Sequence, residues 1–529
     1  MSQATLRRPA PDFSDGELPA AATSSNEGRG ARPVWGAFAL LMTLASMPLV
    51  STILPPLVDY PNHLARMHLL SEGGNAFYAV RWAPLPNLAQ DLIVPSLAGL
   101  MPLDAASKLF LIMTFGLIAS ATIWLNRIVT GVWSAWPLLT FLVLYNRTFL
   151  WGFLNYLFGI GVALGSIALW LALERERTWF RVLTSSLAAM ACYFSHIAAF
   201  GFYALVILGV EAPPGWTEWR TRQRSAFGRR IVVVGAQFVI PTALYLGYWP
   251  NAKGGAIGYG GFWRKADLLF SVFDNYNRVF DIPCFALFLG LLGWLAWTRR
   301  LRPIPRLGWA AIIVFIAYLL LPSQIYGGYG ADHRLPVAFF LLLIAACAPR
   351  FPNRRTAAAI GSVAAILFVV RLAVIEYVWR EADSIYSTDL AGIDALPRNA
   401  KLAVAIPAGA IHVGPVPTVH LAAWAVPRRE AFVPTLFAIP GQQPIALNPP
   451  YATLADAAPP SRFWAALVAG DRVEMVRSLP VLQQYDFVAV TGGEPVHVPP
   501  NQCFKEFFQT PTFQILQIVH DQGCTGPNG

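Results

Sequence analysis

The chain has 529 residues, of which 56% are hydrophobic and 13% are charged, and its mean hydropathy is +0.49. This composition excludes an ordinary soluble domain and is typical of a polytopic α-helical membrane protein. The formal net charge of +10 does not indicate a nucleic-acid-binding protein. The arginines stand in short loops between apolar runs and form no continuous basic face, so membrane topology explains them better.

Residues 1–33 mix arginines with acidic residues in a Pro-, Ser- and Gly-rich sequence that cannot bury a core. This predicts a disordered N-terminal tail. Residues 34–56 then form an apolar run that is long enough to cross a membrane. The run has no small-residue cleavage site after a short hydrophobic stretch, so we expect it to remain as a membrane anchor and not to be removed as a signal peptide.

The loop after this anchor, residues 57–104, opens with a dense cluster of ionisable residues: Asp59, His63, Arg66 and His68. A charge so close to hydrocarbon is costly unless it is paired, so we interpret the carboxylate of Asp59 as a candidate catalytic group. If the chain turns into a helix at Pro61, His63 and Arg66 share a face beside Asp59 and form a small polar site. The alternative is that Asp59 and its neighbours only cap this helix.

Further apolar runs of spanning character stand at 105–126, 133–147, 153–173, 182–196, 197–212, 230–249, 281–297, 307–323, 335–349 and 355–378. With the first run they predict about eleven transmembrane helices. Arginines gather in alternate loops, at 127, 175–181, 220–230, 299–306 and 350–355. All these loops fall on the side of the N-terminal tail, and the positive-inside rule makes that side cytoplasmic. The first loop should then face the periplasm of a bacterial inner membrane, since the excess of Arg over Lys and the abundant Ala indicate a bacterial source.

Further candidate binding residues are predicted on the same outer face: Arg147, His196, His333 and Arg334. The two arginines are the best candidates for a lipid phosphate, because a guanidinium offers two parallel donors to phosphate oxygens. Each residue also has a simpler interpretation. The arginines would reach lipid headgroups, His196 would cap a tight turn after Ser195, and His333 would pair with Asp332.

Residues 380–529 change in character, because charge and proline content rise and the apolar runs shorten. Runs of strand length stand at 401–407, 431–438, 486–491 and 513–519, and helical stretches fit near 383–395 and 462–478. This pattern predicts a soluble α/β domain on the periplasmic side of the transmembrane domain, residues 34–379. Cys503 and Cys524 should form a disulfide there, because that compartment is oxidising.

Three features of the sequence resemble the GT-C superfamily of integral membrane glycosyltransferases: the acidic residue in the first loop, Arg127 at the end of the second span, and the segment from Asp332 to Pro336. The resemblance implies an inverting transfer of a sugar from a polyprenyl-phosphate donor to an extracytoplasmic glycan, lipid or protein. It implies that Asp59 is the general base and that cations hold the lipid phosphate. From their positions in the sequence we predict that substrate or the lipid phosphate is bound by His63, Arg66, Arg147, His196, His333 and Arg334.

The sequence departs from that family where a second acidic residue often stands near the third and fourth spans. Asn146, Arg147 and Asn155 occupy this stretch, so we expect no metal ligands and no cofactor, and a divalent cation is not supported. A transporter or flippase remains the alternative from another class, although the sequence shows no repeated halves. Only Arg371 lies well inside a predicted span, where Glu376 is its expected partner. A catalytically silent partner in polysaccharide assembly is a further alternative.

Overall fold

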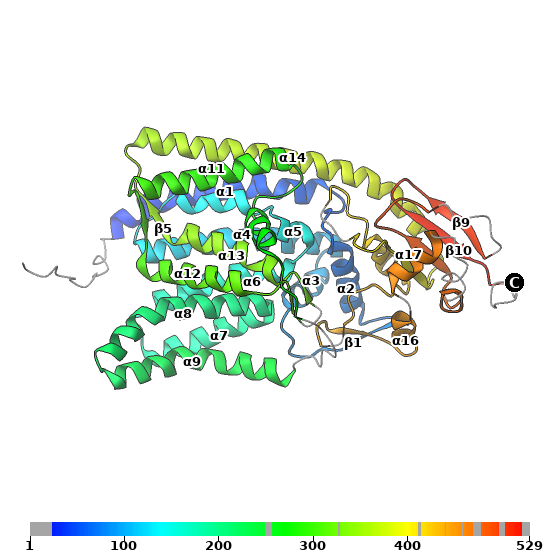
Figure 1. The fold of residues 1–529 in the computed structure, drawn as a ribbon, viewed down its shortest axis with the longest axis horizontal. Coiled ribbons are helices and arrows are strands. Elements are labelled where there is room, and N and C mark those ends of the chain that lie inside the picture. The colour runs from blue at the N-terminus through cyan, green and yellow to red at the C-terminus, as the bar shows by residue number, and fades with distance from the viewer. Residues whose placement is uncertain are drawn as a thin grey trace, which may run out of the picture.

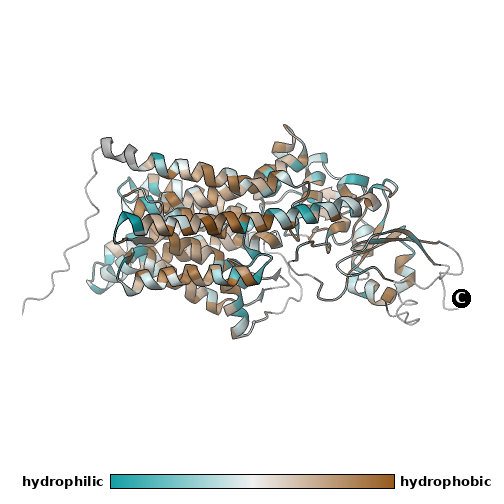
Figure 2. Ribbon diagram, turned by 90° about the horizontal axis from the view of Figure 1, so that it is seen from above, coloured by the Kyte–Doolittle hydropathy of each residue, from teal (hydrophilic) through white to brown (hydrophobic). Residues whose placement is uncertain are grey.

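The computed structural model describes residues 24–248, 257–325, 328–410, 414–439, 441–457, 459–468, 478–496 and 503–520. A bundle of long helices makes up most of the molecule, and a smaller part built from C-terminal residues lies at one end of the bundle (Figure 1). Hydrophobic residues dominate the helices of the bundle along their length (Figure 2). The architecture is that of a polytopic helical membrane protein, as the composition predicts.

Seven helices among the described residues are long and apolar enough to cross a membrane. They are α1 (Ser24–Ser51), α4 (Leu103–Thr130), α6 (Leu154–Ala172), α8 (Ile197–Arg220), α9 (Arg224–Gly247), α11 (Arg278–Trp297) and α14 (Arg354–Asp394). Shorter helices complete the bundle: α7 (Thr178–Ser195), α12 (Pro305–Leu320) and α13 (Ala331–Ala345). The predicted count of about eleven spans is therefore not confirmed.

Two predicted segments differ from the structure. The run 133–147 contains η1 (Trp136–Val143), a 3₁₀ helix of eight residues. At a rise of ~2 Å per residue it is about 16 Å long, which is roughly half the thickness of a hydrocarbon layer. Composition predicts that residues 24–33 belong to the disordered tail, but in the structure they are helical and form the first part of α1. Adding polar residues to an existing helix is easy, because the unfavourable nucleation step has already been taken.

Glycines let neighbouring helices of the bundle approach closely. A Cβ at Gly161 of α6 would stand 2.7 Å from Leu117 Cγ of α4. A Cβ at Gly209 of α8 would stand 2.3 Å from the Cα of Ala310 in α12. Such contacts carry much of the packing energy in a membrane, where lipid tails remove the usual hydrophobic drive between helices.

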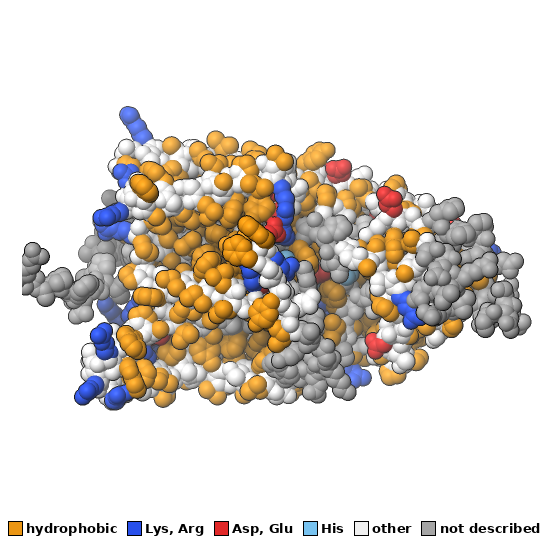
Figure 3. All heavy atoms as spheres, in the orientation of Figure 1, with side chains coloured by type: hydrophobic (Ala, Val, Ile, Leu, Met, Phe, Trp, Pro, Cys, Tyr) orange, Lys and Arg blue, Asp and Glu red, His pale blue; other side chains and the backbone are white. Residues whose placement is uncertain are grey.

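Basic side chains gather at the end of the bundle farthest from the C-terminal part, which we call the basic end (Figure 3). Arg371, by contrast, is buried within α14, and its Nη1 donates to Asp281 Oδ1 of α11 at 2.5 Å. The predicted pairing of Arg371 with Glu376 is thus wrong, because Glu376 accepts hydrogen bonds from Ser51 and Arg380 instead. The buried positive charge of Arg371 in α14 is thus neutralised by a carboxylate of α11.

The first loop folds into α2 (Tyr60–Glu72), the short strand β1 (Tyr78–Val80) and α3 (Ala89–Ala98). Further short elements connect the outer ends of the long helices: α5 (Arg147–Trp151), α10 (Phe262–Phe270), β3 (Gln324–Ile325) and β4 (Gly328–Tyr329). At the basic end, β2 (Leu301–Pro303) pairs antiparallel with β5 (Cys347–Pro349).

The C-terminal part is built on a four-stranded sheet in the order β6, β8, β10, β9. Its strands are β6 (Leu402–Ala405), β8 (Phe487–Val490), β9 (Phe504–Gln509) and β10 (Gln514–Ile518). β6 and β8 are parallel and the other pairs are antiparallel. The remaining elements are η2 (Leu421–Trp424), α15 (Ala425–Arg429), β7 (Ile445–Leu447), α16 (Tyr451–Asp456) and α17 (Pro460–Val468).

Three of the predicted strands correspond to β6, β8 and β10, whereas 431–438 forms turns with an isolated bridge from Phe432 to Lys401. This segment packs on the first loop, where the Tyr78 hydroxyl donates to the Val433 carbonyl at 2.7 Å and accepts from its N–H at 2.9 Å. β7 also pairs with β1. The backbone groups of Val433 and of β7, which could have paired within the C-terminal sheet, instead join the C-terminal part to the first loop.

Helix α14 runs without interruption for 41 residues, from the basic end of the bundle into the C-terminal part (Figure 1). The predicted domain boundary between residues 379 and 380 therefore falls inside one helix. Farther on, Cys503 is disulfide-bonded, while its predicted partner Cys524 lies outside the described residues.

Candidate active site

Asp59 lies where the first loop turns into α2, against the last residues of α5. The Val58 N–H donates to the Leu150 carbonyl at 2.9 Å, and the Asp59 N–H donates to the Trp151 carbonyl at 3.2 Å. Asp59 occupies the N-cap position of α2, but its side chain makes no capping hydrogen bond. The carboxylate is 16% exposed, so it is held in place through the backbone and its oxygens are not used by the helix terminus.

The close contact behind Asp59 depends on a glycine. Gly152 ends α5 with a φ of +92°, and a Cβ at this position would stand 2.8 Å from the Cβ of Asp59. A left-handed backbone and the missing side chain are therefore both needed at Gly152.

We expect Gly152→Ala to destabilise the protein by about 1–3 kcal/mol and to displace Asp59, because both backbone strain and a steric clash are introduced. Thermal unfolding in detergent measures the loss. Gly36→Ala is a matched control, since Gly36 lies in α1 and a Cβ there meets nothing within 4 Å. A Gly152→Ala protein as stable as the Gly36→Ala protein would show that the turn does not need glycine.

The predicted pair on one face of α2 is present, and it has a buried partner. His63 Nε2 donates to the Gly152 carbonyl at 2.9 Å, so Nδ1 accepts from Arg66 Nη2 at 3.1 Å. Arg66 Nε donates to Asp91 Oδ1 of α3 at 2.6 Å, and both side chains of this ion pair are almost fully buried. Burial, reinforced by the Arg66 charge, lowers the pKa of His63 to about 3. His63 is therefore neutral at physiological pH, with both ring nitrogens used in positioning.

His420, from the C-terminal part, faces the carboxylate of Asp59. Its Nε2 lies 3.5 Å from Asp59 Oδ1, and its ring contacts Phe437 edge-on at a centroid distance of 5.3 Å. The side chain of His420 is only 9% exposed. Sequence reasoning did not identify this residue, because it stands far along the chain with no periodic pattern or motif around it. The site is therefore built by both the first loop and the C-terminal part.

Arg334 lies at the start of α13, within electrostatic range of Asp59. Its Nη1 donates to the Gly330 carbonyl at 2.7 Å, and its guanidinium carbon stands 4.4 Å from the ring centroid of Phe153. In the turn between α7 and α8, burial and then the positive charge of Arg334 lower the pKa of His196. His196 Nδ1 also accepts from the Ala198 N–H at 3.0 Å, so the capping interpretation of His196 agrees with the structure.

Arg147 is held by two carboxylates. Its Nη1 donates to Asp267 Oδ2 at 2.8 Å, and its Nη2 forms an ion pair with Asp274. Arg278 contacts the same two acids, at 3.1 Å and 3.0 Å. The charge of Arg147 is thus met within the protein, which weakens its candidacy for binding a phosphate.

Asp332, for which a pairing with His333 is one of the interpretations of the sequence, forms ion pairs with cations of α10. Arg264 Nη2 stands 3.2 Å from Asp332 Oδ1, and Lys265 Nζ stands 3.3 Å from Oδ2. His333 packs against the ring of Trp151 at a centroid distance of 5.5 Å. Within the described ranges, no group of three or more His, Cys, Asp or Glu side chains is arranged to hold a metal ion.

Comparisons with known proteins found similarity in three dimensions only. No family model matches the chain, and no curated protein matches it in sequence. The structure resembles ArnT from Cupriavidus metallidurans bound to undecaprenyl phosphate, with a TM-score of 0.54 and 12% identity over 93% of this chain and 99% of that one. The apo state of the same protein gives a TM-score of 0.52 and 15% identity, over 94% and 100% of the two chains. The chain therefore shares the fold of ArnT over nearly the whole of both chains, and the resemblance drawn from the three sequence features is confirmed at the level of the fold.

Proposed function

We propose that this protein is a membrane glycosyltransferase that moves a sugar from a polyprenyl-phosphate donor to an extracytoplasmic acceptor, with Asp59 as the general base. The observation that carries the proposal is the position of the Asp59 carboxylate. It is anchored by its backbone, free of helix capping, partly exposed, and faced by His420 from the other side of the site. The fold shared with ArnT supports the same reaction class.

In the proposed reaction, the acceptor hydroxyl attacks the anomeric carbon of the sugar while Asp59 takes the hydroxyl proton. The bond between that carbon and the phosphate oxygen breaks, and the electron pair leaves with the lipid phosphate. Attack from the face opposite the leaving group inverts the configuration of the sugar. His420, whose Nε2 stands 3.5 Å from Asp59 Oδ1, positions the carboxylate for this step.

A departing phosphate needs fixed positive donors where its charge develops. We assign this role to Arg334, because its charge interacts with that of Asp59 and its forked guanidinium matches phosphate oxygens. Neutral His63 and the buried pair of Arg66 with Asp91 act as positioning residues, since they fix the start of α2 on which Asp59 stands.

The direct test is transfer by the purified full-length protein in proteoliposomes, with a panel of radiolabelled polyprenyl-phosphate sugars and an envelope extract as the acceptor source. We expect one donor to give labelled product and free polyprenyl phosphate in equal amounts. Movement of intact donor across the bilayer, with no product formed by any member of the panel, would support a flippase and contradict the proposal.

The orientation of the chain can be tested separately. We expect the loops at 220–230 and 299–306 to be cytoplasmic and residues 380–529 to be periplasmic, since arginine-rich loops are retained inside. Alkaline phosphatase fused after Arg380 should be active, and the same reporter fused after Arg300 should be inactive. The reverse pattern would place Asp59 in the cytoplasm.

A further inference from the structure

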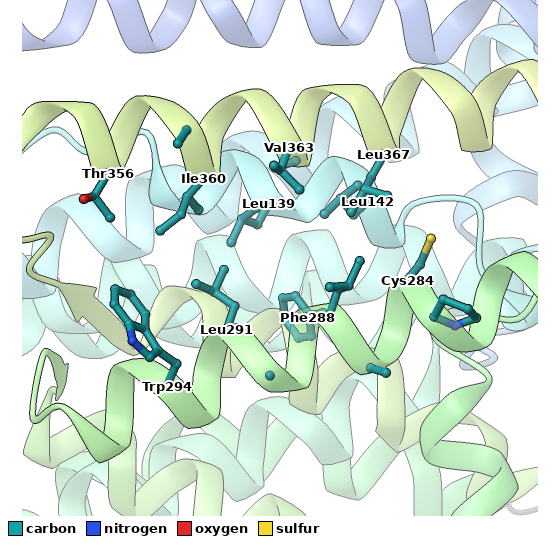
Figure 4. A pocket seen from close by; sticks show the side chains of 16 residues that line it. Leu139, Leu142, Cys284, Phe288, Leu291, Trp294, Thr356, Ile360, Val363 and Leu367 are labelled. Atoms are coloured by element: carbon teal, nitrogen blue, oxygen red, sulfur yellow. The ribbon is translucent and has the colours of Figure 1, made fainter.

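An apolar groove runs along the bundle between α11, η1 and α14, away from the candidate active site. Figure 4 shows side chains of α11 and α14 facing each other across it. Its volume is about 800 Å³, and residues such as Phe288, Leu291, Val363 and Leu367 line it. In a bilayer a groove of this kind is filled by hydrocarbon, because water would leave apolar surface without favourable contacts.

The two ends of the groove differ in charge. Trp294 and Thr356 line it at the basic end, where α11 ends and α14 begins. Arg354 and Arg355 directly precede Thr356, and the guanidinium carbon of Arg300 stands 5.6 Å from the ring centroid of Trp294. Three arginines therefore stand on or next to residues that line the groove at its basic end.

The pairing of β2 with β5 brings further arginines to the basic end. It holds Arg302 opposite Ala348, and the Arg350 N–H donates to the Arg300 carbonyl at 2.8 Å. No Asp or Glu stands between residues 282 and 331 or between 333 and 375. Among the described side chains, no carboxylate forms an ion pair with Arg300, Arg302 or Arg350.

The opposite end of the groove offers no such charge. Cys284 lines it there, close to the buried pair of Asp281 with Arg371, whose charges cancel. A lipid in the groove would thus place its headgroup at the basic end. In the proposed reaction the donor phosphate must lie beside Asp59, at the other end of the bundle, so the groove does not suit the polyprenyl carrier.

We propose that this groove is a binding site for an anionic phospholipid of the leaflet at the basic end. One acyl chain fills the groove between α11 and α14, and the phosphate lies among Arg300, Arg354 and Arg355. This combination of apolar chain burial and guanidinium contacts is what such a lipid requires.

Native mass spectrometry of the full-length protein in detergent tests the site. The probes are phosphatidylglycerol and phosphatidylcholine with identical chains, and polyprenyl phosphate. We expect the wild-type protein to retain one phosphatidylglycerol molecule, with a preference of about tenfold over phosphatidylcholine. Replacing Arg354 and Arg355 together by Gln should abolish the preference while leaving chain binding intact.

Two glycines of α11 provide a matched pair for the apolar part. Gly290 lines the groove and Gly293 does not, and a Cβ at either position meets nothing within 4 Å. Gly290→Leu should lose the bound lipid, and Gly293→Leu should keep it. Val363→Trp narrows the groove from the side of α14, and it replaces Gly290→Leu in the test if that variant elutes as aggregate. Equal retention of the two phospholipids by the wild type, unchanged retention by the groove variants, or displacement of phosphatidylglycerol by polyprenyl phosphate would each overturn the proposal.

Discussion

Replacing Asp59 by Asn is expected to lower the rate of sugar transfer by about 10²–10⁴-fold, the usual contribution of a positioned general base. Asn has nearly the same size as Asp, but it cannot accept a proton near neutral pH. Because the Asp59 side chain makes no capping hydrogen bond, the substitution should leave the stability of α2 almost unchanged. Transfer in proteoliposomes and thermal unfolding in detergent measure the two properties on the same preparation.

Arg334→Ala serves as the companion variant, because its expected effect is different in kind. Removing a phosphate donor should weaken binding of the lipid donor as well as its departure, whereas Asp59→Asn should leave donor binding intact. Binding of a non-transferable donor analogue separates the two cases. An Asp59→Asn protein that unfolds at the wild-type temperature and transfers sugar at the wild-type rate would contradict the role of this carboxylate.

The largest expected effect on stability comes from the ion pair between α2 and α3. Asp91→Ala should cost about 3–5 kcal/mol, because it leaves the guanidinium of Arg66 buried without its charge partner. Replacing both residues together, Arg66→Met with Asp91→Leu, should recover most of that loss, since no uncompensated charge remains. The transition in thermal or denaturant unfolding reports the difference.

The chain provides a control pair of the same chemistry at its surface. Arg428 Nη1 stands 2.7 Å from Asp394 Oδ2, and both side chains are substantially exposed. Asp394→Ala should therefore cost less than about 1 kcal/mol, as solvent screens exposed pairs. Equal losses for Asp91→Ala and Asp394→Ala would mean that burial does not determine the strength of the pair between α2 and α3.

The part of the candidate site that lies at the start of one helix could be predicted from the sequence. His63 and Arg66 stand three residues apart, so the period of a helix was enough to place them together beside Asp59. Asp91 and His420 were not predicted, because their contacts with α2 join separate elements and leave no periodic signal. The same limit explains the wrong partner given to Arg371, for which a neighbour in the same helix was the only one that spacing could offer.

The membrane architecture was predicted where apolar runs were long, as in α4, α6 and α14. It was not predicted where tertiary packing changes the local conformation. Residues 133–147 are as apolar as a spanning helix, yet they contain the short 3₁₀ helix η1, whose side chains are mostly buried within the bundle. Hydropathy measures how well a segment tolerates an apolar environment, and neighbouring helices provide such an environment as readily as lipid does.

The pairing of the first loop with the C-terminal part also imposes an order in time on the synthesis of the protein. Tyr78 and Val433, which share two hydrogen bonds, are 355 residues apart in the chain. At ~5–20 residues per second, ribosomes need roughly 20 to 70 seconds to make the intervening segment. During that interval the loop carrying Asp59 is already made, but β1 has no strand to pair with and His420 does not yet exist. In a nascent chain the candidate site is therefore incomplete until the final quarter of the protein has been made and has folded back onto the first loop.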